Sequence, residues 1–402
     1  MRHARLATLA AALALCASAT HAQDSAAHRL AQDALIVDTH IDAPGMLTDG
    51  WRDLAGETDR EFDHPKARAG GLDVAFMAIY TSPGEDASGA AYDAANHQID
   101  SVLALAARAP DKFAVLTSPA DLKRLSKPGR VLLPMGMENG APLADDLKRV
   151  GFFFERGVRY ITLAHSAANR ISDSSYSTER KWNGLSPFGR EVVAEMNRLG
   201  MMVDVSHLSD AAAVQAIELS TVPVIVSHSA FRHFTPGFER NISDELAKAV
   251  AARGGIVQIP FGTAFVNPQA AANMQAKFTE RAALQARNAK AQAEGRPLED
   301  VAAWNAAWEQ AHPPLDTPLD AVLDQIDYGV KLIGVDHVGL GSDFDGVGGE
   351  LPAELRTVAD FPKLIAGLQR RGYKDADIRK ILGGNFMRVW AAIEAGAAKP
   401  KR

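Results

Sequence analysis

The chain has 402 residues, of which 47% are hydrophobic and 23% are charged, so a disordered or fibrous protein is excluded. Its formal net charge is −6, and this acidic balance argues against a nucleic-acid-binding surface. The length is sufficient for one large hydrophobic core or for two domains.

Residues 1–22 have the three parts of an export signal. Arg2 and Arg5 supply a basic start, segment 6–16 is apolar, and small residues follow up to Ala22. The apolar run is too short to span a membrane comfortably. We therefore expect a signal peptide at 1–22 and an exported protein, either periplasmic or secreted. A buried first helix is the less favoured alternative.

The only cysteine, Cys16, lies inside this segment, so the mature chain would have no disulfide. Lipidation of Cys16 is disfavoured because the preceding Leu15 is bulky where a small residue is expected. Residues 394–402 are small, polar and basic, without an apolar anchor signal. We therefore predict no stable membrane anchor.

Eight short apolar runs follow the signal, each rich in valine, isoleucine, leucine or methionine. Such runs are typical of strands buried on both faces of a parallel sheet. Segments with helical periodicity separate them, and Ser209 and Ser243 stand where two helix N-caps are expected. The alternation predicts an α/β fold of the (β/α)8 TIM-barrel class, as a single domain over residues 23–402. The runs are Ala34–His40, Asp73–Tyr80, Val131–Glu138, Tyr160–His165, Met201–His207, Val222–His228, Gly255–Phe261 and His337–Phe344.

One segment, at about residues 270–310, departs from this repeat. It is rich in Ala, Gln, Glu, Lys and Arg and contains few large apolar residues. The composition predicts one or two exposed helices inserted between the seventh and eighth strands. The simplest interpretation is a solvated helical excursion, and a lid or a dimer surface is the alternative.

Six of the eight runs end in, carry or lead directly into a residue that can bind a metal ion or move a proton. In a (β/α)8 fold the C-terminal ends of the strands meet at one rim, so these side chains should converge. A single histidine or acid at a strand end is usually structural, but the set would require the same coincidence at strand after strand. The residues are His40, Asp42, Glu138, His165, His207, His228 and Asp343.

These histidines and carboxylates are more than one tetrahedral zinc ion needs. They suit two metal ions that share a carboxylate and a water molecule, whose pKa the ions lower toward neutrality. Because no cysteine takes part, zinc is the first choice, with manganese and cobalt as alternatives.

A series of motifs occurs in order between about Ala34 and Trp390. They are Val37-Asp38-Thr39-His40-Ile41-Asp42, Gly136-Met137-Glu138-Asn139-Gly140, Thr162-Leu163-Ala164-His165, Gly184-Leu185-Ser186-Pro187-Phe188-Gly189, Met202-Val203-Asp204-Val205-Ser206-His207, Pro223-Val224-Ile225-Val226-Ser227-His228-Ser229, Arg240-Asn241, Gly341-Ser342-Asp343-Phe344-Asp345-Gly346 and Gly384-Asn385. With these motifs the chain resembles the membrane dipeptidase (renal dipeptidase) family of zinc peptidases, within the amidohydrolase superfamily.

The resemblance implies a binuclear zinc hydrolase that cleaves dipeptides. His40 and Asp42 look like ligands of one zinc ion, and His207 and His228 look like ligands of the other. Glu138 looks like the bridge between the two ions, together with a water or hydroxide that attacks the scissile carbonyl.

The resemblance also implies roles around the metal pair. His165 matches a substrate-contacting histidine, and Asp343 matches the acid that handles protons beside the metal-bound water. Arg240 matches the residue that meets the C-terminal carboxylate of the substrate, although pattern alone favours a surface arginine before a helix N-cap. The resemblance allows L,L- and L,D-dipeptides, dehydropeptides and a β-lactam ring as substrates. It also suggests that the protein forms a homodimer.

Two other interpretations stay open. A lactonase or phosphotriesterase-like enzyme on the same scaffold often uses a carboxylated lysine at a strand end, and no such lysine is visible. An exported metal-binding or solute-binding protein would need ligands but no proton carrier, so His165 and Asp343 argue against it.

The chain departs from some family members in two places. Its 270–310 insertion is longer, and it lacks their lipid-anchor signal.

Overall fold

A parallel sheet forms the centre of the computed structural model, which describes residues 25–48, 51–177 and 179–397. The signal peptide expected at 1–22 lies outside these residues. The strands follow the order β10-β9-β8-β7-β6-β5-β2-β4-β3, and β1 also pairs with β2. Their bounds are β1 (Ile36–Ile41), β2 (Leu72–Tyr80), β3 (Phe113–Ala114), β4 (Val131–Leu132), β5 (Met135–Glu138), β6 (Val158–Thr162), β7 (Met202–Asp204), β8 (Ile225–Val226), β9 (Ile256–Ile259) and β10 (Val338–Leu340).

The sheet is curled, because its first and last strands meet. The Asp42 N–H donates to the carbonyl of Phe344 at 2.9 Å, and the Asp343 N–H donates to the carbonyl of His40 at 3.1 Å. The expected strand Val131–Glu138 is divided into β4 and β5, with Pro134 between them. Proline has no N–H to give to a sheet, which accounts for the break.

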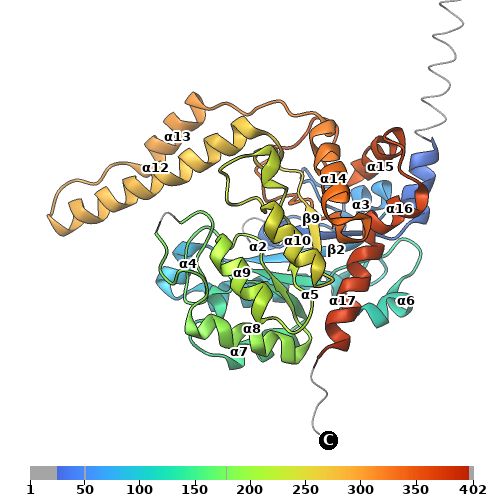
Figure 1. The fold of residues 1–402 in the computed structure, drawn as a ribbon, viewed down its shortest axis with the longest axis horizontal. Helices are drawn as coiled ribbons and strands as arrows, with labels where there is room; N and C mark the ends of the chain where they lie inside the picture. Colours follow the sequence, from blue (N-terminus) through green and yellow to red (C-terminus); the bar gives the residue numbers. More distant parts are fainter. Residues whose placement is uncertain (1–24, 49–50, 178, 398–402) are drawn as a thin grey trace, which may run out of the picture.

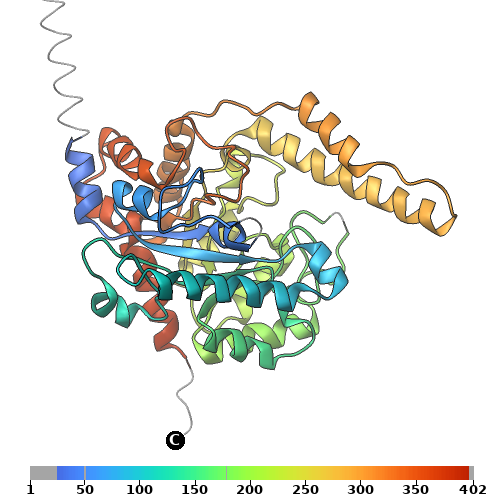
Figure 2. The same cartoon turned by 180° about the vertical axis from the view of Figure 1, so that it is seen from behind.

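Helices cover the outside of the curled sheet, as Figures 1 and 2 show from opposite sides. Ser209 and Ser243 accept hydrogen bonds from the backbone of Ala212 and Leu246, which confirms the two expected N-caps. None of the helices within the described ranges is long and apolar enough to cross a membrane. Around the sheet lie α2 (Ala43–Thr48), α3 (His64–Gly70), α4 (Pro83–Ser88), α5 (Ala91–Arg108), α6 (Leu122–Leu125), α7 (Lys148–Glu155), α8 (Pro187–Leu199), α9 (Asp210–Leu219), α10 (Asp244–Ala252), α11 (Thr263–Val266), α14 (Leu319–Ile333), α15 (Phe361–Arg370), α16 (Asp375–Arg379) and α17 (Asn385–Ala395).

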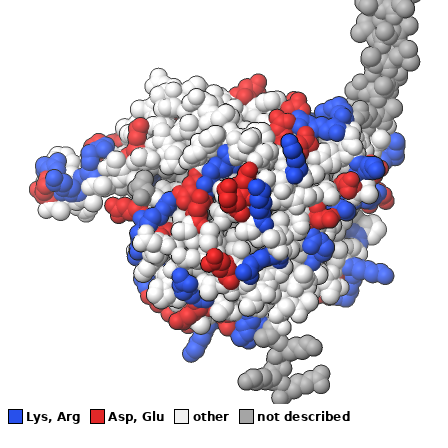
Figure 3. Space-filling view, in the orientation of Figure 1, with Lys and Arg blue, Asp and Glu red and all other residues white. Residues whose placement is uncertain are grey.

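Two further helices, α12 (Pro268–Ala293) and α13 (Val301–Ala311), lie between β9 and β10 and project from the body of the protein (Figure 1). We call residues 268–311 the helical arm. Arg287 of α12 pairs at 2.6 Å with Glu299, which lies in the segment that leads into α13. Figure 3 shows charges of both signs at the far end of the arm, and none of the residues of α13 is buried. A polar surface of this kind explains how the arm extends into solvent.

The N-terminal ends of the strands are closed by α17. Phe386 and Trp390 on this helix lie with their ring centroids 5.2 and 5.3 Å from the ring of Phe76 on β2. The same buried cluster includes the ring of Tyr160 on β6. Because apolar side chains fill this end of the sheet, a polar site can form only at the opposite, C-terminal ends of the strands.

Replacement of Trp390 by alanine should therefore remove a central part of this cluster. We expect the free energy of unfolding to fall by about 3–5 kcal/mol, because the cavity left by a buried tryptophan is only partly refilled. Urea denaturation followed by circular dichroism measures the change. Trp51, which is 57% exposed, provides the control, and its replacement should cost less than about 1 kcal/mol. Equal costs at both positions would contradict the assigned packing.

Candidate active site

The metal-binding and proton-carrying side chains expected from the sequence do converge at the C-terminal ends of the strands. A cavity of about 870 Å³ lies there, lined by residues that include Asp42, Glu138, His165, His207 and Asp343. The remaining members of the expected set, His40, His228 and Arg240, are buried beneath it, with 0, 0 and 2% of their surface exposed.

Glu138 stands at the centre of this group. Its Oε1 atom lies 3.2 Å from Nε2 of both His207 and His228 and 3.4 Å from Nε2 of His165. Its Oε2 atom lies 3.4 Å from Nε2 of His40. The two oxygens of one carboxylate therefore face different histidines, as a bridging ligand would require.

A second acidic group lies on the other side of His40. The Nε2 atom of His40 is 3.5 Å from Oδ2 of Asp42, and both atoms are buried without a hydrogen-bond partner among the described residues. Asp343 joins this group with a backbone φ of 66°, and His207 has the same left-handed φ of 66°. Such backbone conformations are costly away from glycine and are often retained at functional sites.

The residues present fit divalent metal ions. Imidazole nitrogens and carboxylate oxygens, without sulfur, suit zinc, manganese or cobalt. The Nε2 atoms of His207 and His228 are 2.8 Å apart, and the orphaned atoms of His40 and Asp42 face the same space. Three groups have ligand atoms within 4.8 Å of one another: His40–Glu138–His228, Glu138–His165–His207 and His40–Asp42–Asp343.

The orientation of His228 is fixed by a buried chain of hydrogen bonds. The Ser227 hydroxyl donates to Oδ2 of Asp204 at 2.6 Å, so its oxygen accepts from Nδ1 of His228 at 2.8 Å. Asp204 also accepts from the Thr162 hydroxyl at 2.5 Å. The proton of neutral His228 is therefore on Nδ1, and the lone pair of Nε2 faces Glu138.

Tyr160 has the same effect on His40. Its hydroxyl donates to the carbonyl of Thr39 at 3.1 Å and lies 2.8 Å from Nδ1 of His40. Both contacts are satisfied when Nδ1 of His40 is the donor, which leaves Nε2 to face the acidic group. A Cβ atom at Gly136 would lie 1.9 Å from the Tyr160 ring, so glycine is required beside this tyrosine.

Sequence reasoning missed these orienting residues. Asp204 and Ser227 stand inside the motifs that end at His207 and His228, but only the terminal histidines drew attention. Polar residues inside an apolar run could have served as the signal, because a buried polar group needs a partner. Tyr160 has no comparable signal, since tyrosine is common in strands.

The charges of the site favour a cation. Burial alone would lower the pKa of His40, but the carboxylates of Glu138 and Asp42 outweigh this effect and raise it to about 10. Burial holds the pKa values of His207 and His228 well below the usual range, which favours neutral imidazoles. A divalent ion bound here would take the place of the His40 proton in this negative field.

Arg240 is not the surface arginine that its sequence pattern alone favours. Its guanidinium donates to the Ser229 hydroxyl at 2.5 Å and to the carbonyl of His228 at 2.8 Å. It also donates to Nε2 of His207 at 2.9 Å and stacks over the ring of Phe265. The sequence pattern did not predict this burial, because it depends on how β8 and the loop before α10 place Arg240 underneath the histidines.

Comparison with known proteins gives a consistent result over nearly the whole chain. The family model described as membrane dipeptidase (Peptidase family M19) matches residues 24–402. Dipeptidase tcpJ of Claviceps purpurea (strain 20.1) is 31% identical over 357 residues, which cover 87% of this chain and 72% of the relative. The crystal structure of the probable dipeptidase PvdM from Pseudomonas aeruginosa is 27% identical, with a TM-score of 0.80 over 94% of this chain and 100% of the other.

A more distant structure shares the fold. It is a metallo peptidase from Rhodobacter sphaeroides, liganded with a phosphinate mimic of the dipeptide L-Ala-D-Ala. Its sequence is 23% identical to this chain, with a TM-score of 0.73 over 90% of this chain and 99% of the other.

The orientation of His228 gives a test of the site. Ser227→Ala removes the acceptor for Nδ1 of His228, and we expect zinc affinity to fall about 10- to 100-fold, as for other partners of metal-binding histidines. Equilibrium dialysis against a zinc buffer measures this loss, and Ser227→Thr should restore affinity. Ser220→Ala is the matched control, because it removes a buried hydroxyl that contacts Asn197 and Val222 instead. Equal zinc affinity in the Ser227→Ala variant and the wild type would exclude the orienting role.

Proposed function

Because the chain belongs to the membrane dipeptidase family, peptidase family M19, we propose that it is a binuclear zinc dipeptidase for substrates with a free C-terminal carboxylate. The observation that carries this proposal is the Glu138 carboxylate, whose oxygens face His40 on one side and His207 and His228 on the other. The phosphinate dipeptide mimic bound by the Rhodobacter sphaeroides protein supports a dipeptide substrate, L,D-dipeptides included.

In this proposal His40 and Asp42 would hold one zinc ion, His207 and His228 would hold the other, and Glu138 would serve both. When bound there, the two ions would supply an activated water and a Lewis acid for the scissile carbonyl. The chain itself contributes preorganisation, since Glu138, His40 and His228 are almost fully buried and do not need to move.

Asp343 is the proposed proton carrier. It lines the cavity beside Asp42, and burial raises the pKa of its carboxyl group above the usual range. A carboxylate with a raised pKa accepts a proton from water more readily and returns it to the leaving amine. Its left-handed backbone turns the side chain toward the acidic group of the site.

His165 is the proposed contact for the substrate carbonyl oxygen. Its ring lies against Tyr80 and His207, with centroid distances of 4.8 and 4.1 Å. Burial lowers its pKa to about 4, so the imidazole is neutral near pH 7. A neutral imidazole can donate one hydrogen bond to charge that develops on the carbonyl oxygen without repelling nearby cations.

Arg240 is the proposed partner of the substrate carboxylate. Its Nη2 atom now donates to Nε2 of His207, and that nitrogen cannot accept the bond once its lone pair binds a metal ion. The N–H group is then free to turn to a carboxylate, for which a guanidinium has matching geometry. This link would couple metal binding by His207 to recognition of the substrate terminus.

The proposal extends to the scaffold. We assign residues 23–402 to a single (β/α)8 barrel domain, supported by the backbone hydrogen bonds of 2.9 and 3.1 Å that join the ends of β1 and β10. Export after removal of 1–22 and homodimer formation stay predictions of the sequence.

Removal of metal gives the direct test. The purified protein should hydrolyse simple dipeptides such as L-Ala-L-Ala and L-Ala-D-Ala, and exhaustive chelation should abolish this activity. Addition of zinc should restore it, with two ions bound per chain by atomic absorption. Full activity after chelation would contradict the proposal, and a single bound ion would remove the bridging role of Glu138.

Two variants separate metal binding from proton transfer. Asp343→Asn should retain both zinc ions and lower kcat about 100-fold or more, because the amide cannot carry a proton. Glu138→Gln should lose zinc as well as activity, since a neutral amide is a weaker bridge. Metal analysis alongside kinetics distinguishes the two effects. Loss of zinc from Asp343→Asn would make Asp343 a ligand instead of a proton carrier.

A further inference from the structure

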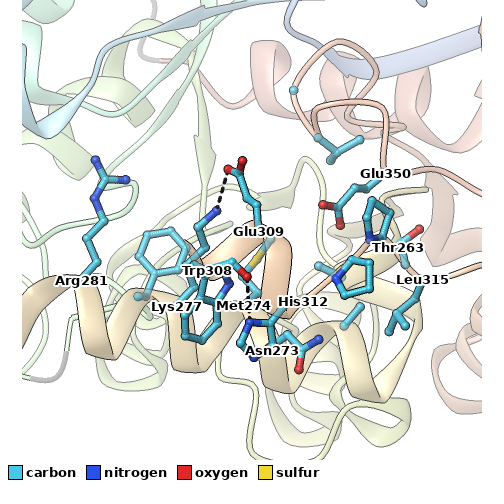
Figure 4. A pocket seen from close by; sticks show the side chains of 17 residues that line it. Thr263, Asn273, Met274, Lys277, Arg281, Trp308, Glu309, His312, Leu315 and Glu350 are labelled. Atoms are coloured by element: carbon cyan, nitrogen blue, oxygen red, sulfur yellow. Dashed lines mark hydrogen bonds and ion pairs between the residues drawn. The ribbon is translucent and has the colours of Figure 1, made fainter. Parts of the chain in front are cut away.

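A second cavity, of about 320 Å³, lies beneath the helical arm (Figure 4). Met274, Lys277 and Phe278 of α12 form one wall, and Trp308 of α13 forms another. The third wall is the loop that follows β10, represented by Val347. The arm therefore encloses space against the body of the protein in addition to projecting into solvent.

This cavity adjoins the candidate active site. Met274, Phe278, Gly346 and Val347 line both spaces. A Cβ atom at Gly346 would lie 2.3 Å from Oδ2 of Asp42 and 2.4 Å from Oδ1 of Asp343. Gly346, which lines the second cavity, therefore lies directly beside the proposed metal ligand Asp42 and the proposed proton carrier Asp343.

Aromatic contacts involve side chains on two walls of this cavity. Phe278 stacks on Tyr176, which also lines the larger cavity, with ring centroids 4.1 Å apart and planes inclined by 19°. Trp308 stacks on His312 at 3.9 Å, and Nδ1 of His312 lies 3.0 Å from the carbonyl of Trp308. These contacts hold Phe278 and Trp308 against neighbouring rings on two faces of the cavity.

The lining has no net charge. Lys277 pairs with Glu309 at 3.6 Å, as the dashed line in Figure 4 shows. The other ionised residues of the lining, Arg281 and Glu350, have opposite signs. An occupant with its own charge would therefore meet no excess of opposite charge here, whereas an uncharged apolar group gains the contacts of the aromatic walls.

We propose that this cavity is a subsite for a large, uncharged apolar side chain on one of the two residues of the dipeptide substrate. The inference rests on the proposed dipeptidase function and adds a specificity to it. A volume of 320 Å³ accommodates a leucine, phenylalanine or tryptophan side chain but not a further domain or chain. The arm then selects substrates, while the strand ends perform the chemistry.

A dipeptide panel tests the proposal on the zinc-loaded full chain. The series X-Ala and Ala-X, with X as Ala, Leu, Phe, Glu or Lys, should show the highest kcat/KM for Leu or Phe in at least one series. Trp308→Ala removes a wall and should lower the ratio of kcat/KM for Phe over Ala about tenfold in that series. Trp304→Ala changes a ring on α13 that lies outside the lining, with its centroid 5.6 Å from that of Trp308, and should leave this ratio within twofold.

A variant that fills the cavity distinguishes loss of the subsite from a general loss of structure in the arm. Asn273 lines the cavity and its exposed neighbour Ala272 does not, so Asn273→Trp should lower the same ratio and Ala272→Trp should not. Hydrolysis of the panel with ratios unchanged in both Trp308→Ala and Asn273→Trp would overturn the subsite and leave the dipeptidase function intact. Failure of the zinc-loaded wild type to hydrolyse any dipeptide would overturn both.

Discussion

The structure depends on one buried carboxylate. Glu138 is only 3% exposed, and four imidazoles from β1 and from the ends of β6, β7 and β8 lie 3.2–3.4 Å from its two oxygens. An ionised group in such a position is costly unless positive or hydrogen-bonding partners surround it. The ends of several strands must therefore meet at this point, and the close approach of β1 to β10 is part of the same requirement.

The hydrophobic core and the polar site are not independent. Tyr160 belongs to the apolar cluster that α17 closes, yet its hydroxyl orients His40. The Asp204–Ser227 pair orients His228 in the same way from the wall between β7 and β8. Packing below the site therefore decides which nitrogen of each imidazole faces Glu138, and this decides whether a metal ion can bind.

The proposed chemistry and the proposed selectivity lie on different parts of the chain. The proposed ligands and proton carrier come from short, buried strand ends, whereas the proposed subsite is made by the exposed arm and the loop that contains Gly346 and Val347. Loops and insertions can change their side chains without disturbing the sheet, so a scaffold of this kind can alter its substrate preference while its metal site stays constant.

The sequence alone determined the features that are local. Side chains at positions i and i+2 of a strand share a face, so His40 and Asp42 could be paired, and the apolar runs placed Glu138 at a rim. Only the tertiary structure decided the features that join distant residues. The burial of Arg240 under His207, the contact of Tyr160 with His40 across 120 positions, and the cavity under the arm depend on how separate strands and loops meet. No periodicity records such contacts, because they are fixed by the packing of the whole curled sheet.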